Sequence, residues 1–326
     1  MDETSEWLES DDGTKLFLRR WMVSLPPKPP AAVVHIVHGM AEHSLRYKRL
    51  AGRLCSQGFE VWAADQRGHG RTADSSVNDP RRGGLLGHCA DRDGFFRVVA
   101  DIDVINAKIG EKYPGLPLFL LGHSWGSFIA QAYIEKYGSR LTGCILSGTR
   151  GPGGPEVTLG APLLGLIAAL KGSRRGSALA HAMADGPYNK PFRPNRTLFD
   201  WLSRDEEEVD AYIADPLCGN LCSVGFYRDM VRAFTKIHSP EAMKGIPRNL
   251  PVYIFCGSAD PVGAMGQSPT ALMSAYRSLG MADLEFVLYP DARHETLNET
   301  NREEVTGNLL SWLERRCRSA SAKTAE

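Results

Sequence analysis

Short apolar runs, each bounded by turn residues, recur along the chain. Seven of them lie at residues 15–21, 32–38, 59–65, 117–123, 141–148, 252–257 and 284–290. They are continuous rather than alternating, with a β-branched character. Strands of this kind are buried on both faces, as in a parallel sheet. The pattern therefore predicts a sheet that other elements cover on both sides.

Helical patterns lie between these runs. One apolar stripe recurs every three to four residues, at Val98, Ile102, Ile105 and Ile109. We expect this helix to end near Gly110 or before Pro114. Strands that alternate with helices favour an α/β sheet with helices on both faces. The first run, 15–21, precedes a proline-rich segment and is expected to form an antiparallel edge strand.

The alternation stops between about residues 149 and 247, where Gly, Pro and charged residues separate several helical patterns. We interpret 149–247 as a helical cap inserted between two parts of one core, 1–148 and 248–317. An apolar stretch of the cap, 159–170, fits either an acyl-chain pocket or a helix that packs on the core. The remaining residues, 318–326, are expected to form a disordered tail.

A serine lies between two glycines where one apolar run passes into a helical pattern. The stretch is GHSWG, with Ser124 at its centre and Gly122 and Gly126 on either side. A strand-to-helix turn this sharp strains the serine backbone and leaves no room for side chains two positions away. It exposes the hydroxyl at a helix start, which favours developing negative charge. We predict that Ser124 is a nucleophile; the alternative is an ordinary glycine-rich turn before a helix.

A serine nucleophile needs a base, and the base needs an orienting acid. In this type of fold the order along the chain is serine, acid, histidine, each after the end of a strand. Asp260 and His294 follow the last two apolar runs. We predict that His294 takes the Ser124 proton and that Asp260 orients the imidazole. The alternatives are a turn residue for Asp260, a solvated loop histidine for His294, and Asp291 as the acid.

The oxyanion of an acyl-transfer transition state needs two backbone donors. We expect one from the N–H of Trp125, directly after the serine. The other is expected from the N–H of Met40, in the loop that follows the run 32–38. The remaining histidines are interpreted as packed or hydrogen-bonded groups, and the side chain of His123 is expected to point away from the site.

Metal and cofactor signals are weak. His38 and His43 do not form the H-E-x-x-H zinc pattern. Cys218 and Cys222 are close in sequence, but no second pair stands at zinc-site spacing, so we interpret them as packed or solvated thiols. No dinucleotide-binding or phosphate-binding glycine motif is present. We therefore predict no metal and no cofactor.

Composition excludes further classes. The chain has 326 residues, of which 43% are hydrophobic, enough for a sizeable core. Lys and Arg number 38, and so do Asp and Glu, so no net charge attracts nucleic acid or an anionic membrane. Seven cysteines lie without a disulfide pattern, and the N-terminus shows no apolar leader. These features predict a cytoplasmic protein.

Five motifs together resemble the α/β-hydrolase superfamily. They are HGMAEHSLRY at 38–47, DQRGHGRT at 65–72, GHSWGS at 122–127, GSADPV at 257–262 and RHETLNE at 293–299. The resemblance is greatest to the monoacylglycerol lipase and lysophospholipase branch, which is grouped with the serine aminopeptidase S33-like hydrolases. It implies a mostly parallel central sheet flanked by helices, with a helical cap after the sixth strand. It also implies a triad of Ser124, Asp260 and His294, with oxyanion amides at Met40 and Trp125.

Two positions depart from that family pattern. Members often have a small residue or Met after the nucleophile, and glycine before the Glu of the "EH" pair. This chain has Trp125 and Ala41 there. The indole of Trp125 is expected to narrow the site, which bears on the substrate more than on the chemistry.

We expect a serine carboxylester hydrolase that cleaves single-acyl-chain esters through an acyl-enzyme on Ser124. The substrate would be a monoacylglycerol, a lysophospholipid or a simpler ester. The alternatives are a serine peptidase or thioesterase of the same fold, and a non-catalytic binding protein. The expected partner is a small-molecule ester or lipid and not nucleic acid. Transient membrane-surface contact through the cap is left open, and the sequence does not indicate an oligomeric state.

Overall fold

Eight strands form one sheet in the computed structural model of the chain, which describes residues 1–23, 29–153, 162, 164–165, 167–168, 172–184 and 186–325. The strands are β1 (Asp2–Glu9), β2 (Lys15–Met22), β3 (Ala32–Val37), β4 (Phe59–Asp65), β5 (Leu118–His123), β6 (Gly143–Ser147), β7 (Val252–Gly257) and β8 (Leu284–Tyr289). Their order across the sheet is β1-β2-β4-β3-β5-β6-β7-β8. Every residue of β3 to β7 is buried, as continuous apolar runs predict.

The sheet is parallel except at one end. Strands β3 to β8 pair in parallel, whereas β2 is antiparallel to both β1 and β4. The run 15–21 is therefore antiparallel as predicted, but the prediction that it forms the edge is wrong, because β1 lies outside it. Strand β1 has the sequence DETSEWLE and is mostly exposed, so no apolar run marks it. Backbone pairing with β2 holds it, from Asp2 opposite Met22 to Glu9 opposite Lys15.

Helices cover both faces of the sheet, each over its own apolar core. On one face lie α1 (Lys48–Ser56) and α10 (Arg302–Ala325). On the other lie α2 (Gly94–Lys112), α3 (Trp125–Tyr137) and α9 (Gln267–Ser278). The predicted stripe is the buried face of α2. Short 3-10 helices are η1 (Ser44–Tyr47), η2 (Gly70–Ala73), η3 (Pro80–Arg82), η4 (Gly138–Arg140), η5 (Lys190–Phe192) and η6 (Thr296–Asn298).

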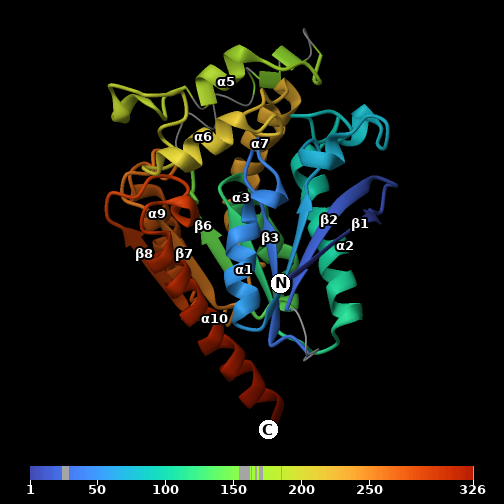
Figure 1. Ribbon diagram of the computed structural model, residues 1–326, viewed down its shortest axis with the longest axis vertical. Coiled ribbons are helices and arrows are strands. Elements are labelled where there is room, and N and C mark those ends of the chain that lie inside the picture. Colours follow the sequence, from blue (N-terminus) through green and yellow to red (C-terminus); the bar gives the residue numbers. More distant parts are fainter. Residues whose placement is uncertain are drawn as a thin grey trace.

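Between β6 and β7 the described chain forms helices instead of strands. They are α5 (Ala178–Ala184), α6 (Glu206–Ala214), α7 (Val224–Ile237) and α8 (Pro240–Met243). Figure 1 shows α5, α6 and α7 together beyond one end of the sheet, where they cover the loops that carry the site. Most of the apolar stretch 159–170 lies outside the described residues. Of its described residues, Leu164 and Ala168 are buried.

Helix α10 is longer than the sequence suggested. It continues to Ala325 and extends away from the sheet (Figure 1), so the disordered tail predicted from residue 318 is wrong as far as 325. The added residues are rich in alanine, the strongest helix former, and they prolong a helix that packing has already nucleated.

Among the described helices, none is long and apolar enough to span a membrane. The cytoplasmic location stays a prediction.

Candidate active site

Ser124 lies in a sharp turn between β5 and α3. Its backbone has φ 52° and ψ −123°, a conformation that residues with a side chain rarely adopt. The Ser124 N–H donates to the Ser147 carbonyl at 2.9 Å, and the Ser127 N–H donates to the Ser124 carbonyl at 2.8 Å. These bonds hold the strained turn, so the hydroxyl stands at the N-terminus of α3.

Space requires both flanking glycines. A Cβ on Gly122 would lie 2.3 Å from the carbonyl oxygen of Gly126. A Cβ on Gly126 would lie 2.1 Å from the carbonyl oxygen of Val37, the last residue of β3. Both neighbours are backbone atoms, which cannot swing aside as a flexible side chain can. The turn therefore brings the start of α3 directly against two strands.

Asp260 and His294 meet although 34 residues separate them. Asp260 follows β7 and His294 follows β8, and both side chains are buried. The two Asp260 carboxylate oxygens each lie 3.0 Å from Nδ1 of His294. The N–H of Val262 donates to the same carboxylate at 2.9 Å and fixes its orientation. Asp291, the competing acid, is exposed at the turn after β8.

Burial alone would lower the pKa of His294. The charge and hydrogen bond of Asp260 outweigh that effect, with smaller contributions from Glu295 and Glu42, and the pKa of His294 is raised above its ordinary value. The carboxylate therefore stabilises the imidazolium that would form during a proton transfer.

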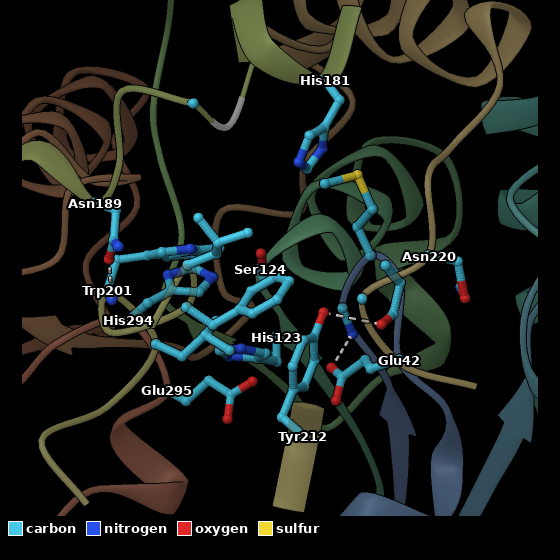
Figure 2. A pocket seen from close by; sticks show the side chains of 18 of the residues that line it. Glu42, His123, Ser124, His181, Asn189, Trp201, Tyr212, Asn220, His294 and Glu295 are labelled. Atoms are coloured by element: carbon cyan, nitrogen blue, oxygen red, sulfur yellow. Dashed lines mark hydrogen bonds between the residues drawn. The ribbon is translucent and has the colours of Figure 1, made fainter. Parts of the chain in front are cut away.

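A cavity of about 320 Å³ joins Ser124 and His294 to the cap. Figure 2 shows the Ser124 side chain in the middle of this space, with His294 and Trp201 on one side and Asn220 on the other. Ser124 and His294 are not hydrogen bonded to each other in this structure. In enzymes, contacts between a nucleophile and its base are often long until a substrate binds.

His123 also reaches the cavity wall, contrary to the prediction that it points away. Its ring centre lies 4.9 Å from that of His294, and its Nδ1 lies 3.2 Å from the Ser147 hydroxyl. Burial, and then the nearby charge of His294, lower the pKa of His123 to about 4. It is therefore uncharged at neutral pH.

Both amides predicted for the oxyanion adjoin Ser124. Met40 lies in the loop after β3 and lines the cavity, and Trp125 begins α3, where an N–H has no partner inside the helix. Within the described residues neither N–H donates a hydrogen bond to the backbone or to a side chain. The loop after β3 is close to Ser124, because a Cβ built on Gly39 would lie 3.3 Å from the Cβ of Ser124.

Glu42 anchors this loop. Its Oε1 accepts from the Gly39 N–H at 2.5 Å and from the Tyr47 hydroxyl at 2.8 Å, and its Oε2 accepts from Arg46 at 2.7 Å. Arg46 also donates twice to the carboxylate of Glu295, the residue after His294, at 2.6 and 2.7 Å. One guanidinium thus connects this loop, the predicted oxyanion loop (residues 38–43), to the loop that carries His294.

Mutual attraction keeps Glu42, Glu295 and Arg46 in their charged forms. Burial would raise the pKa of Glu42 and of Glu295, but Arg46 beside them lowers both. Burial would likewise lower the pKa of Arg46, and the two carboxylates raise it well above its usual range. All three groups are therefore charged at neutral pH.

The structure shows how alanine is accommodated at position 41, where members of the family often have glycine. Its φ is 54°, in the left-handed region where a residue with a Cβ costs roughly 1–2 kcal/mol and glycine does not. The cap stabilises this conformation, because the Ala41 carbonyl accepts from the Gly219 N–H at 2.9 Å and from the Tyr212 hydroxyl at 3.0 Å.

Trp125, the other departure, does not narrow the site as expected. Its side chain is 2% exposed, and Trp125 is not among the described residues that line the cavity. Its ring stacks on His69, with centres 5.2 Å apart, and lies 5.0 Å from the ring of Phe226 in α7. The indole packs between the core and the cap instead.

The cap adds residues that sequence reasoning did not single out. The Trp201 ring lies 5.1 Å from the His294 ring, and the Trp201 carbonyl accepts from the His294 N–H at 3.3 Å. The side-chain oxygen of Asn189 in turn accepts from the Trp201 N–H at 3.0 Å. An aromatic residue in a helical cap is a weak signal, and its contact with a histidine so distant in the chain has no sequence signature.

Comparison with known proteins places this arrangement in a family. Residues 28–301 match the family described as serine aminopeptidase, S33. The chain belongs to this family. The S33 match spans the sheet from β3 to β8 together with the cap region.

Relatives of this S33 chain extend over nearly its whole length. It is 28% identical to the monoacylglycerol lipase of Mycolicibacterium smegmatis over 291 residues, 88% of this chain and 90% of that protein. It is 28% identical to the monoglyceride lipase of Homo sapiens over 331 aligned positions, 98% and 92% of the two chains. A carboxyl esterase from Bacillus coagulans, solved with glycerol, is 27% identical and gives a TM-score of 0.87 over 97% of this chain and 99% of that one. The α/β-hydrolase fold and the branch predicted from the motifs are confirmed.

Proposed function

We propose that this protein is a serine carboxylester hydrolase that cleaves single-acyl-chain esters through an acyl-enzyme on Ser124. The observation that carries the proposal is the Asp260–His294 pair, which opens on the same cavity as a serine held at a strained helix start. Monoacylglycerols, lysophospholipids and simpler carboxylic esters are the substrates proposed. The relatives are named as monoacylglycerol or monoglyceride lipases and as a carboxyl esterase, which supports an ester as the class of substrate.

In the first half-reaction the Ser124 oxygen attacks the ester carbonyl carbon while Nε2 of His294 takes the hydroxyl proton. Asp260 holds the imidazole by Nδ1 and stabilises its positive charge. The N–H groups of Met40 and Trp125 donate to the oxyanion, and each such donor lowers the barrier by about 2.7–4 kcal/mol. The bond to the alcohol then breaks, and the imidazolium returns its proton to the departing alkoxide.

In the second half-reaction His294 removes a proton from water, and the resulting hydroxide attacks the acyl carbon. The same two amides stabilise the second oxyanion. Collapse breaks the bond to Ser124, which recovers its proton from His294, and the fatty acid leaves. No group outside this chain and the water is required.

The cavity wall favours a neutral, largely apolar substrate. The cap contributes Leu198, Phe199, Trp201 and Leu202. The acidic residues among the described lining are Glu42 and Glu295, and both are bound to Arg46. A peptide with a free α-ammonium group would need an unpaired carboxylate for recognition, so this wall supports an ester over an aminopeptidase substrate.

The cap also carries exposed apolar side chains, one of them at the cavity. Leu198 is 82% exposed and still lines the cavity, so it lies at its mouth. Leu179 of α5 and Ile213 of α6 are exposed as well. These side chains support transient contact of the cap with a lipid surface, from which a single-chain ester would be drawn.

A fluorophosphonate probe and an ester panel test the proposal. The wild-type protein should be labelled and Ser124→Ala should not, whereas Ser274→Ala, an exposed serine of α9, should label normally. An unlabelled wild type would favour the non-catalytic alternative. Hydrolysis of p-nitrophenyl esters from acetyl to palmitoyl, beside monoacylglycerols and lysophospholipids, tests the acyl part. A steep preference for the shortest chains would defeat the lipid assignment and leave the esterase chemistry standing.

A further inference from the structure

Three side chains of the types that ligate metals lie close together where the oxyanion loop contacts the cap. His43 belongs to the loop after β3, and Asp215 and Cys218 form a turn directly after α6. Nε2 of His43 lies 2.8 Å from Oδ2 of Asp215. One ligand atom from each of the three residues lies within 4.8 Å of the other two. Among the described residues, this is the cluster of three or more metal-ligand side chains that the structure contains.

Hydrogen bonds shape the cap turn and join it to the loop. In the cap turn, the N–H of Leu217 donates to Oδ1 of Asp215 at 2.8 Å, and the N–H of Cys218 donates to the Asp215 carbonyl at 3.0 Å. The next residue, Gly219, donates to the Ala41 carbonyl of the loop at 2.9 Å. The Oδ2 of Asp215 is thereby left to face His43. A bound ion would need only small side-chain movements to be enclosed.

The surrounding charge suits a cation. Arg46 is the nearby positive group, and it acts electrostatically on both Asp215 and Cys218. Its charge is already met by Glu42 and Glu295 at hydrogen-bond distance. Asp215 adds a third carboxylate within electrostatic range of this one guanidinium, so the acidic groups outnumber the positive one.

We propose that His43, Asp215 and Cys218 form a binding site for a thiophilic divalent cation of the zinc class. Imidazole nitrogen, carboxylate oxygen and thiolate sulfur are the donors that Zn²⁺ takes in proteins, whereas Mg²⁺ prefers oxygen alone. Three protein ligands leave a fourth position for water. The site lies three residues beyond Met40, so the ion would tie the cap turn to the loop that carries a proposed oxyanion amide.

Metal binding should stabilise the folded chain, since the unfolded chain does not present these residues together. The effect should depend on the metal. Zn²⁺ should raise the melting temperature of the chelator-treated, dialysed protein, and Mg²⁺ should not. This dependence separates a ligand site from the ordinary His43–Asp215 hydrogen bond, which needs no metal.

Retention of metal and its spectrum test the proposal without any ester substrate. After desalting, the wild type should retain one equivalent of Zn²⁺, and its Co²⁺ form should show a sulfur-to-cobalt charge-transfer band in the near ultraviolet. Cys218→Ala should lose that band, and Asp215→Asn should bind at least about tenfold more weakly, the scale seen even for second-shell changes. Cys317→Ala is the matched control, because Cys317 is the other cysteine that is not fully buried.

Several outcomes would overturn the site. Failure of the wild type to retain Zn²⁺ would do so, as would an unchanged cobalt spectrum in Cys218→Ala. Retention with no sulfur band would place the metal elsewhere, for example at His123 and His294. If Cys218→Ala does not fold, Asp215→Asn carries the same comparison. Because the readouts are metal content and absorption, they stand or fall independently of ester hydrolysis.

Discussion

Both carboxylate oxygens of Asp260 lie 3.0 Å from the Nδ1 atom of His294. A carboxylate only accepts hydrogen bonds, so Nδ1 must carry the proton of the neutral imidazole. Nε2 is then the nitrogen with a free lone pair, and His294 lines the cavity together with Ser124. This single contact therefore selects the tautomer that a general base requires.

The same contact sets an expected pH dependence. Burial alone would depress the pKa of His294, and Asp260 raises it above the ordinary 6.5. A base works only while neutral, and a raised pKa means that protonation begins at a higher pH. We expect kcat/KM for a neutral ester to fall as the pH is lowered through a midpoint above 6.5, measured on the wild type across the range where the protein stays folded.

His123 provides an internal check on that assignment, because it lines the same cavity with a pKa of about 4. An acid limb near pH 4, or a flat profile, would contradict His294 as the base. In Asp260→Asn the charge that raises the pKa of His294 is gone. The acid limb of the pH profile, measured on any residual activity, should therefore move to lower pH.

Asp260→Asn should also lower kcat strongly. An asparagine in the place of the carboxylate can present its N–H₂ to Nδ1 and favour the wrong tautomer, and such a change costs about 10⁴-fold in a triad of this kind. Asp291→Asn is the matched control, since Asp291 is exposed on the loop that leads to His294. It should leave kcat within about twofold, as surface changes away from special features usually do little. Similar losses in both variants would argue against Asp260 as the orienting acid.

Gly126→Ala should destabilise the fold. The new Cβ would lie 2.1 Å from the Val37 carbonyl oxygen and 2.5 Å from that of His38, and both are backbone atoms. Overpacking of this kind costs roughly 1–3 kcal/mol or more, which urea denaturation would show as a lower midpoint. Gly110→Ala in α2 is the control, because its Cβ would meet nothing within 4 Å. That variant should be more stable than the wild type by about 0.5–1 kcal/mol.

The elements that the sequence predicted best are those with a local signal. The buried strands could be read from continuous apolar runs, and the turn at Ser124 from a strand, two glycines and a helix in succession. The positions of Asp260 and His294 follow from strand order, because the ends of neighbouring parallel strands meet at one edge of a sheet. These inferences need only the spacing of apolar residues along the chain and the order in which the strands follow one another.

What the sequence could not predict depends on long-range packing. Strand β1 carries mostly exposed polar residues, so pairing rather than burial places it. The direction of the Trp125 side chain depends on His69 and Phe226, which reach it from other loops and helices. The contact of His43 with Asp215 joins residues 172 positions apart. A motif search along the chain could not assemble that cluster.

Glu42 provides a last test, of how the oxyanion loop is held. Its carboxylate binds both the Gly39 N–H and Arg46, whereas Glu295 binds Arg46 without touching Gly39. Glu42→Gln and Glu295→Gln each remove one of the two charged partners of Arg46. Both should lower stability, but by less than the roughly 3–5 kcal/mol lost when a buried charge is left unpaired, because the other carboxylate remains. The catalytic consequences should differ between the two variants.

In Glu42→Gln the amide group can turn its N–H₂ toward the Gly39 N–H and push the loop away from Ser124. A displacement of about 1 Å at a catalytic group can cost about 10²-fold, so we expect kcat to fall by up to that factor with a smaller change in KM. In Glu295→Gln the loop keeps its anchor, and kcat should fall much less once the two variants are compared at a temperature where both are folded. Steady-state kinetics beside thermal unfolding would decide the matter: equal losses of kcat in both variants would show that Arg46, rather than the Gly39 contact, is what the oxyanion loop depends on.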